Sequence, residues 1–124
     1  MGLLDGLMGN ASEVDAAEIQ AELAEILASN EQVVHAYKMV RDLHVFTNKR
    51  MINIDKQGVT GKKADYLSIP YKSITQFNVQ TAGRFDTDCE LKVWVSGQAD
   101  ALEIEIKASL ATAIQKTLAD MLFA

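Results

Sequence analysis

The chain has 124 residues, of which 48% are hydrophobic, so it is long enough for one domain with a substantial core. It carries 12 basic and 17 acidic residues, and the net charge of −5 argues against a general nucleic-acid-binding protein. The single proline argues against a linker-rich or disordered chain, and no apolar run approaches the ~18 residues that a membrane-spanning helix needs.

The charges are segregated along the sequence. Residues 1–37 contain seven acids and no Lys or Arg, residues 38–84 contain nine bases and three acids, and residues 85–124 contain three bases and seven acids. A basic middle between two acidic ends is typical of solvated faces that differ in charge. The alternative is that complementary patches meet within the fold or between copies.

The first eleven residues combine glycines with the apolar residues Leu3, Leu4, Leu7 and Met8. We interpret this segment as an arm that packs on its own domain or on a neighbouring subunit. A membrane-touching segment is disfavoured, because no Lys or Arg flanks it to attract anionic lipid. The segment lacks the basic region and cleavage site of a secretory signal, so we expect a cytoplasmic location.

A helix is predicted from Ser12 to the Ser29-Asn30 pair. Ser12 and Asp15 have the spacing of a capping arrangement, in which acids favour the first turn. The apolar residues of this stretch recur at helical spacing and predict one buried stripe; they are Ile19, Leu23, Ile26 and Leu27. We therefore divide the chain into an arm and helix over residues 1–30 and a domain over residues 31–124, which together form a single domain.

Beyond Glu31 the hydrophobic period changes to two, which is the period of strands. Turn signals separate seven such stretches, near residues 32–40, 43–47, 51–56, 65–69, 73–81, 89–96 and 101–107. Ser109 then begins a closing amphipathic helix, whose stripe consists of Leu110, Ile114, Leu118, Met121 and Leu122. The pattern predicts an α+β, mainly β protein, in which about seven antiparallel strands form an open barrel plugged by the C-terminal helix.

At the residue level the chain resembles the bacterial pleckstrin-homology (PH) domain family. The matching segments are MGLLDGL at the start, RDLHVFTNKRMINIDKQGVTGKK over 41–63, SIPYKSIT over 68–75 and TAGRFDTDCELKVWVSGQ over 81–98. The resemblance implies a PH fold and a cyclic ring of identical subunits, for which we expect a pentamer. The resemblance implies no enzyme activity. It implies instead a role in protein–protein interaction at a hydrophilic surface where strands of adjacent subunits meet.

The stretch 89–96 predicts a two-faced strand. Alternation places Cys89, Leu91, Val93 and Val95 on one face, and Glu90, Lys92, Trp94 and Ser96 on the other. Trp94 on a charged face either covers its own sheet, packs under a loop or makes a subunit contact, since Trp is enriched at the centres of interfaces. We therefore take Trp94, Glu90 and Lys92 as the candidate oligomer or partner interface.

An alternative function is binding of anionic lipid headgroups at a membrane surface. The candidate anion contacts are Lys38, Arg41, Lys49 and Arg50, all in or beside hairpin turns. Lys38 and Arg41 lack a second cation on the following strand to complete a clamp, and Asp42 repels an anion. Solvated turn charges explain these residues as well, so membrane binding is disfavoured but stays open.

The sequence contains no recognisable catalytic or cofactor motif, so we expect neither enzyme activity nor a cofactor. The two histidines, His35 and His44, have no cysteine or carboxylate pair at ligand spacing, which makes a metal site improbable on this pattern. Asp86 and Asp88 lack the further oxygen donors of a Ca²⁺ loop. Cys89 is the single cysteine and fits a small buried hydrophobe. The expected partners are other copies of the chain and an unidentified protein, and not nucleic acid.

Overall fold

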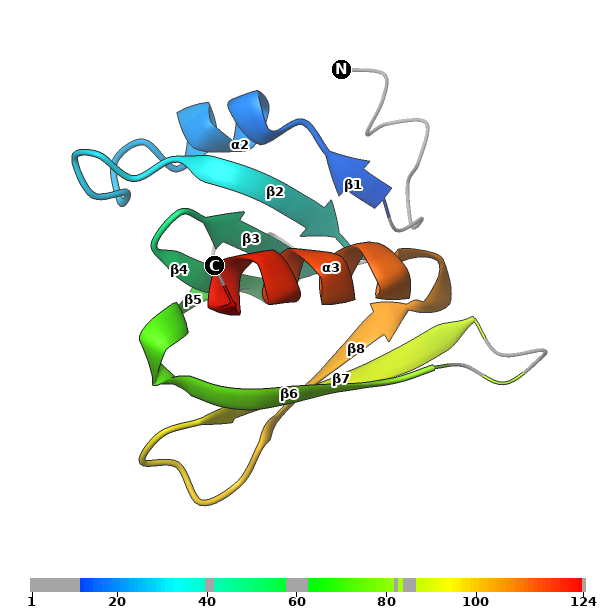
Figure 1. The fold of residues 1–124 in the computed structure, drawn as a ribbon. Coiled ribbons are helices and arrows are strands. Elements are labelled where there is room, and N and C mark those ends of the chain that lie inside the picture. Colours follow the sequence, from blue (N-terminus) through cyan, green and yellow to red (C-terminus); the bar gives the residue numbers. More distant parts are fainter. Residues whose placement is uncertain (1–11, 40–41, 58–62, 82, 84–86, 124) are drawn as a thin grey trace. The chain divides into compact units, whose positions relative to one another are not determined.

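A computed structural model describes residues 12–39, 42–57, 63–81, 83 and 87–123. The chain divides into two compact units, Met1–Ser68 and Ile69–Ala124. The eight strands of the described residues form two sheets, and a helix ends the second unit (Figure 1). The mainly β fold with a C-terminal helix agrees with the predicted class. None of the helices in these described ranges is long and apolar enough to cross a membrane.

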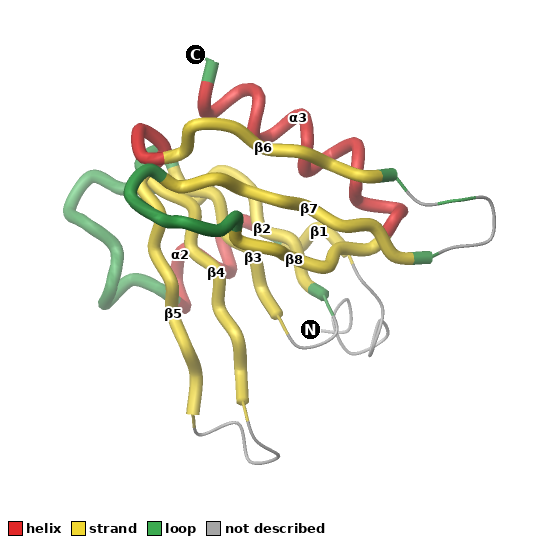
Figure 2. The backbone as a smooth tube through the Cα atoms, turned by 90° about the horizontal axis from the view of Figure 1, so that it is seen from below, coloured by secondary structure: helices red, strands yellow, loops and turns green. Residues whose placement is uncertain are grey.

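The first unit holds a five-stranded sheet in the order β1-β2-β3-β4-β5. Its strands are β1 (Ser12–Val14), β2 (Val33–Lys38), β3 (Asp42–Thr47), β4 (Arg50–Gln57) and β5 (Lys63–Pro70). The pairings of β1 with β2, β2 with β3 and β3 with β4 are antiparallel, and the register shifts between Val33 and His35. The sheet order leaves β5 at one edge, beside β4 (Figure 2).

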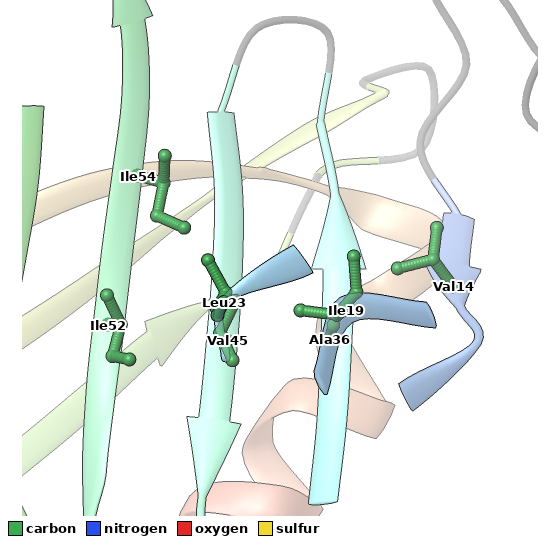
Figure 3. Packing of buried hydrophobic residues seen from close by; sticks show 7 residues of the cluster. All are labelled: Val14, Ile19, Leu23, Ala36, Val45, Ile52 and Ile54. Carbon is green, nitrogen blue, oxygen red and sulfur yellow. The ribbon is translucent and has the colours of Figure 1, made fainter. Parts of the chain in front are cut away.

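One face of this sheet packs under helix α2 (Ala16–Glu22). Apolar side chains from the helix and from four strands converge there (Figure 3), namely Val14, Ile19, Leu23, Ala36, Val45, Ile52 and Ile54. All seven are buried, so this cluster is the core of the first unit. Since each buried aliphatic side chain contributes about 1.5–3 kcal/mol, the cluster explains why a helix of seven residues is stable here.

The prediction of the N-terminal helix is wrong at both of its ends. Ser12 lies in β1, the N-cap is Asp15, and the Asp15 carboxylate accepts a hydrogen bond of 2.9 Å from the Ala17 amide. The helix ends at Glu22, and Ile26, assigned to the buried stripe, is 46% exposed. The antiparallel pairing of residues 12–14 with β2 overrides the local capping pattern, because it places Val14 in the core.

The second unit holds a three-stranded antiparallel sheet in the order β6-β7-β8. Its strands are β6 (Ile74–Gln80), β7 (Asp88–Val95) and β8 (Leu102–Lys107), with a short 3-10 turn, η1 (Tyr71–Ser73), before β6. A second 3-10 turn, η2 (Ala108–Leu110), leads into helix α3 (Ala111–Leu122), which packs against β6 and η1. The helix buries Ile114 and Leu118 of the predicted stripe.

Ser109 was predicted to cap the closing helix, and this prediction is wrong. The residue lies inside η2, the N-cap of α3 is Leu110, and no side chain caps this helix end by a hydrogen bond. The 3-10 turn continues directly into the α-helix, so Ser109 never takes the extended backbone conformation of an N-cap.

Candidate interaction surface

Strand β7 has the two faces that the alternation predicts. Cys89, Leu91 and Val93 are buried, with at most 7% of their surface exposed, whereas Glu90, Lys92 and Trp94 on the other side are partly exposed. The burial of Cys89 confirms its interpretation as a small buried hydrophobe. The three residues predicted as an interface therefore share one face of one strand.

Neighbouring strands extend this face into rows of polar side chains. In register, Asn78 of β6 lies beside Lys92 and Gln80 beside Glu90. On the other side of β7, Glu103 pairs with Lys92, Glu105 with Glu90, and Lys107 with Asp88. Trp94 lies beside Gln76 at the end of the rows. We call these side chains the polar face: Gln76, Asn78, Gln80, Asp88, Glu90, Lys92, Trp94, Glu103, Glu105 and Lys107.

The polar face carries a shallow hollow of about 130 Å³. Four side chains from two strands line it, namely Asn78, Gln80, Glu90 and Lys92. Two carboxamides, a carboxylate and an ammonium group thus surround a space that is large enough for the end of a side chain from another molecule. The hollow joins two of the three predicted interface residues, and the third, Trp94, follows Lys92 on the same face.

The charges of the polar face are only partly compensated. The Lys107 ammonium donates a hydrogen bond of 2.7 Å to the Asp88 carboxylate. This bond lowers the pKa of Asp88, with help from a hydrogen bond to Glu105, and raises the pKa of Lys107. Glu90 and Glu105 lie directly opposite each other across β7 and β8, although Glu105 also interacts with Asp88 and with the charge of Lys107.

The residues proposed as alternative anion contacts do not come together at one place. Lys38 ends β2 and pairs with Leu43 near the start of β3, whereas Lys49 lies in the turn after Thr47 at the other end of β3. A six-residue strand spans roughly 17–20 Å, too far for two side chains to clamp one phosphate. Arg41 lies outside the described residues.

Arg50 is already paired with a buried carboxylate. Its Nε donates to Oε2 of Glu31 at 2.8 Å and its Nη2 to Oε1 at 3.1 Å, and it also reaches the Ile26 carbonyl and the Ser68 hydroxyl. Glu31 is 3% exposed. Burial by itself raises the pKa of Glu31, but hydrogen bonds from Arg50, the Ala28 amide and the Thr47 hydroxyl outweigh it and lower the pKa to about 2.

The histidines share a face of the first sheet but bind different partners. His44 is buried, its Nδ1 lies 3.0 Å from Oδ1 of Asn53, and its Nε2 has no hydrogen-bond partner. His35 instead pairs with Glu13 at 2.7 Å. No group of three or more His, Cys, Asp or Glu that could hold a metal ion occurs in the described part of the chain. Asp88 is in β7 and binds Lys107, and Asp86 lies outside the described residues.

The strand predicted near residues 65–69 is β5, but the exposure of its large side chains is a feature that the sequence reasoning missed. Both faces of this strand are exposed over much of its length, and the large side chains of Tyr66 and Leu67 are 52% and 42% exposed. Two consecutive large hydrophobic residues point to opposite faces of a strand, so both faces are exposed at this pair, whereas Ile69 near the end of the strand is buried. The sequence signal was the pair Tyr66-Leu67 before Pro70, which alternation alone did not distinguish from a covered strand.

Two β-sheets followed by a C-terminal helix are the features of a PH-like domain. A family model described as the bacterial PH domain matches residues 2–122, and the chain belongs to this family. It is 62% identical over 97 residues to the uncharacterized protein YjqA of Bacillus subtilis, covering 78% of each chain. It is 34% identical over 98 residues to YozO of the same organism, covering 79% of this chain and 82% of YozO.

Solved structures show the same similarity. A DUF1696 family protein with a pleckstrin-homology domain from Shewanella loihica is 56% identical, with a TM-score of 0.82 and coverage of 92% of this chain and 98% of that one. A pleckstrin homology domain from Shewanella amazonensis is 57% identical, with a TM-score of 0.82 and coverage of 99% and 100%. The PH-like fold expected from the resemblance is therefore confirmed.

Proposed function

We propose that this chain is a non-catalytic PH-like module that assembles into a cyclic homo-oligomer, with a pentamer as the expected size, and acts through protein–protein interaction. The observation that carries the proposal is the exposed strand β5 at the edge of the first sheet. Membership of the bacterial PH domain family supports a binding role rather than a catalytic one.

An exposed edge strand of this kind is a template on which strands of other chains can pair, so it promotes association of the molecule. Its outer N–H and C=O groups have no partner strand in the sheet of the described residues, and Tyr66 and Leu67 expose apolar surface on both sides. Proteins that stay monomeric usually blunt such an edge with charges, bulges or prolines. β5 is eight residues long, its charged residues Lys63 and Asp65 lie in its first half and its proline is at the last position, so the part around Tyr66 and Leu67 is suited to contact another chain.

The polar face around Trp94 is a second surface of different character. A cyclic assembly requires each subunit to present two different, mutually complementary surfaces to its two neighbours. The chain has such a pair in the exposed edge strand and the polar face, and this supports a head-to-tail arrangement over a symmetric two-fold dimer.

Sedimentation velocity of the wild type and of Leu67→Lys tests the proposal. The wild type should sediment as one species larger than the 13.6 kDa monomer. The variant should shift to the monomer with an unchanged circular dichroism spectrum, because a lysine on an edge strand opposes association. Ile26→Lys is the matched control, since Ile26 is 46% exposed in a loop, and it should assemble normally. A monomeric wild type at every concentration would overturn the proposal.

A further inference from the structure

The hollow on the polar face is lined by side chains that have no partner within the protein. Asn78, Gln80, Glu90 and Lys92 surround its volume of about 130 Å³. None of these four side chains makes a hydrogen bond or an ion pair in the part of the chain that the structure describes. Their donors and acceptors are therefore available to a ligand.

The chemistry of this lining matches a neutral ligand that is rich in hydroxyl groups. Each carboxamide offers one acceptor and two donors, the Glu90 carboxylate only accepts, and the Lys92 ammonium only donates. A sugar hydroxyl both donates and accepts, so it finds a counterpart at each of the four positions. The one negative and the one positive charge of the lining cancel, so the hollow as a whole matches an uncharged molecule.

Trp94 adds an aromatic surface next to the hollow. It follows Lys92 on the same face of β7 and lies beside Gln76 of β6 in register. Its side chain is partly exposed. The face of an indole ring is apolar and carries partial negative charge, and it attracts the C–H groups on one side of a sugar ring, which are apolar and partly positive. Trp94 thus provides the apolar contact that the polar lining lacks.

The dimensions of the site fit a short oligosaccharide. Pockets for drug-sized molecules have roughly 300–1,000 Å³, so the smaller hollow has room for a single sugar ring. Glu90 and Trp94 lie four residues apart on β7, which is about 13 Å in a strand. A chain of a few sugar units that follows β7 therefore places one ring on Trp94 and another in the hollow.

The surroundings of the hollow disfavour charged ligands. The polar face has four carboxylates and two ammonium groups, so it repels anions; they belong to Asp88, Glu90, Glu103, Glu105, Lys92 and Lys107. The Lys92 ammonium opposes a cation inside the hollow. Among the described residues, no group of three or more His, Cys, Asp or Glu could hold a metal ion.

We propose that the hollow and Trp94 form a binding site for a neutral oligosaccharide, in which one sugar ring stacks on the indole and the four side chains of the hollow bind the hydroxyls of a second ring. This inference goes beyond the proposed function and does not rest on self-assembly.

A fluorescence titration tests the site directly, because Trp94 is the single tryptophan of the chain. Cellohexaose and maltohexaose, two neutral glucose oligomers of different shape, are added to the wild type and to Leu67→Lys. The variant is included because no neighbouring copy should cover its polar face. At least one sugar should change the Trp94 emission saturably. No change with either sugar in either protein, up to millimolar concentration, would overturn the inference.

Two variants of the hollow keep Trp94 as the reporter. Asn78→Ala and Gln80→Ala should each raise the dissociation constant of the sugar about tenfold, because each removes hydrogen bonds to it. Both residues are exposed, so neither variant should unfold. The matched control is Gln115→Ala, which removes an exposed carboxamide from α3 and should bind like the wild type. Equal affinities of the three variants would overturn the assignment of the hollow.

Salt and a peptide probe establish the class of the ligand. The dissociation constant of a neutral sugar should stay constant between about 0.05 and 0.5 M sodium chloride, because salt screens only charged partners. A hexaglycine peptide with blocked ends should give no response. A response to this peptide and none to the sugars would overturn the inference. Sugar binding by a wild type that sediments as a monomer would support this site and overturn the proposed self-assembly.

Discussion

Glu31 and Arg50 form a bidentate ion pair in the first unit of this domain. Nε and Nη2 of the guanidinium donate hydrogen bonds to the two carboxylate oxygens at 2.8 and 3.1 Å. Around this pair, the Glu31 carboxylate also accepts bonds from the Ala28 amide and the Thr47 hydroxyl. These hydrogen bonds connect the loop that follows α2 to the turn between β3 and β4. The pair explains why a charged residue at position 31 is buried at all.

Replacing Glu31 by Gln should lower the free energy of unfolding by about 3 kcal/mol, because the guanidinium of Arg50 is left half-buried without its counter-charge. Urea denaturation followed by circular dichroism measures this change. The control is Glu22→Gln on the exposed surface of α2, which should stay within about 0.5 kcal/mol of the wild type. Equal stabilities of the two variants would refute a stabilising role for the pair.

The same carboxylate should dominate the acid sensitivity of the fold. The pKa of Glu31 falls from 4.5 to about 2 on folding, so its stabilising contribution is complete above about pH 4.5 and is lost as the pH falls toward 2. The loss amounts to on the order of 3 kcal/mol. Unfolding free energies measured from pH 6 to pH 2 should show this decline in the wild type and a smaller one in Glu31→Gln; parallel curves would contradict it.

His44 should add a second pH dependence at higher pH. Burial lowers the pKa of His44 below its ordinary value of 6.5, although the bond to Asn53 and the charge of Asp42 act in the opposite direction. The neutral ring is therefore favoured in the folded state, and stability is complete above about pH 6.5 and decreases below it. His44→Gln should flatten the stability curve between pH 8 and 5. A wild-type curve that is flat there would rule the effect out.

Trp94→Ala should lower the mass of the assembly seen by light scattering while the monomer stays folded. The indole is only partly buried on its own sheet, so its removal costs the fold little, whereas truncation of an aromatic residue at the centre of an interface typically costs 2 kcal/mol or more. Phe123→Ala, which removes another exposed aromatic side chain, is the control. An unchanged mass for Trp94→Ala would remove Trp94 from the interface.

This protein should not co-sediment with vesicles that contain anionic lipid at moderate salt. Arg50 is neutralised by Glu31, and Lys38 and Lys49 lie at opposite ends of β3, so they do not form one anion site. Co-sedimentation with vesicles of 30% phosphatidylserine, compared with neutral vesicles, measures this. Pelleting that depends on Lys38 and Lys49 would favour the membrane alternative instead.

Much of the fold could be predicted from the sequence, because the two-residue period of the strands directly reflects burial. The alternation of Cys89, Leu91 and Val93 against Glu90, Lys92 and Trp94 appears unchanged in β7. The prediction failed where local and tertiary signals compete. Ser12 has the pattern of a helix cap but pairs with Lys38 in β1, and only the position of β2 decides between the two.

The candidate site was accessible to sequence reasoning only in part. Strand parity placed Glu90, Lys92 and Trp94 together, but register with β6 and β8 was needed to find the like-charge pair and the hollow. The ion pair of Arg50 with Glu31 could not be predicted from the sequence. Glu31 lies 19 residues before Arg50, at the point where the hydrophobic period changes from that of a helix to that of a strand, and this pattern does not indicate a partner. The exposure of β5 likewise depends on which strands form the edge of the sheet.

The most direct test of self-assembly is native mass spectrometry of the wild-type protein across a range of concentrations. We expect discrete masses at one integer multiple of 13.6 kDa, with five subunits as the expected number, and little monomer at micromolar concentration. A clean monomer over the whole range, with its fold intact by circular dichroism, would contradict it.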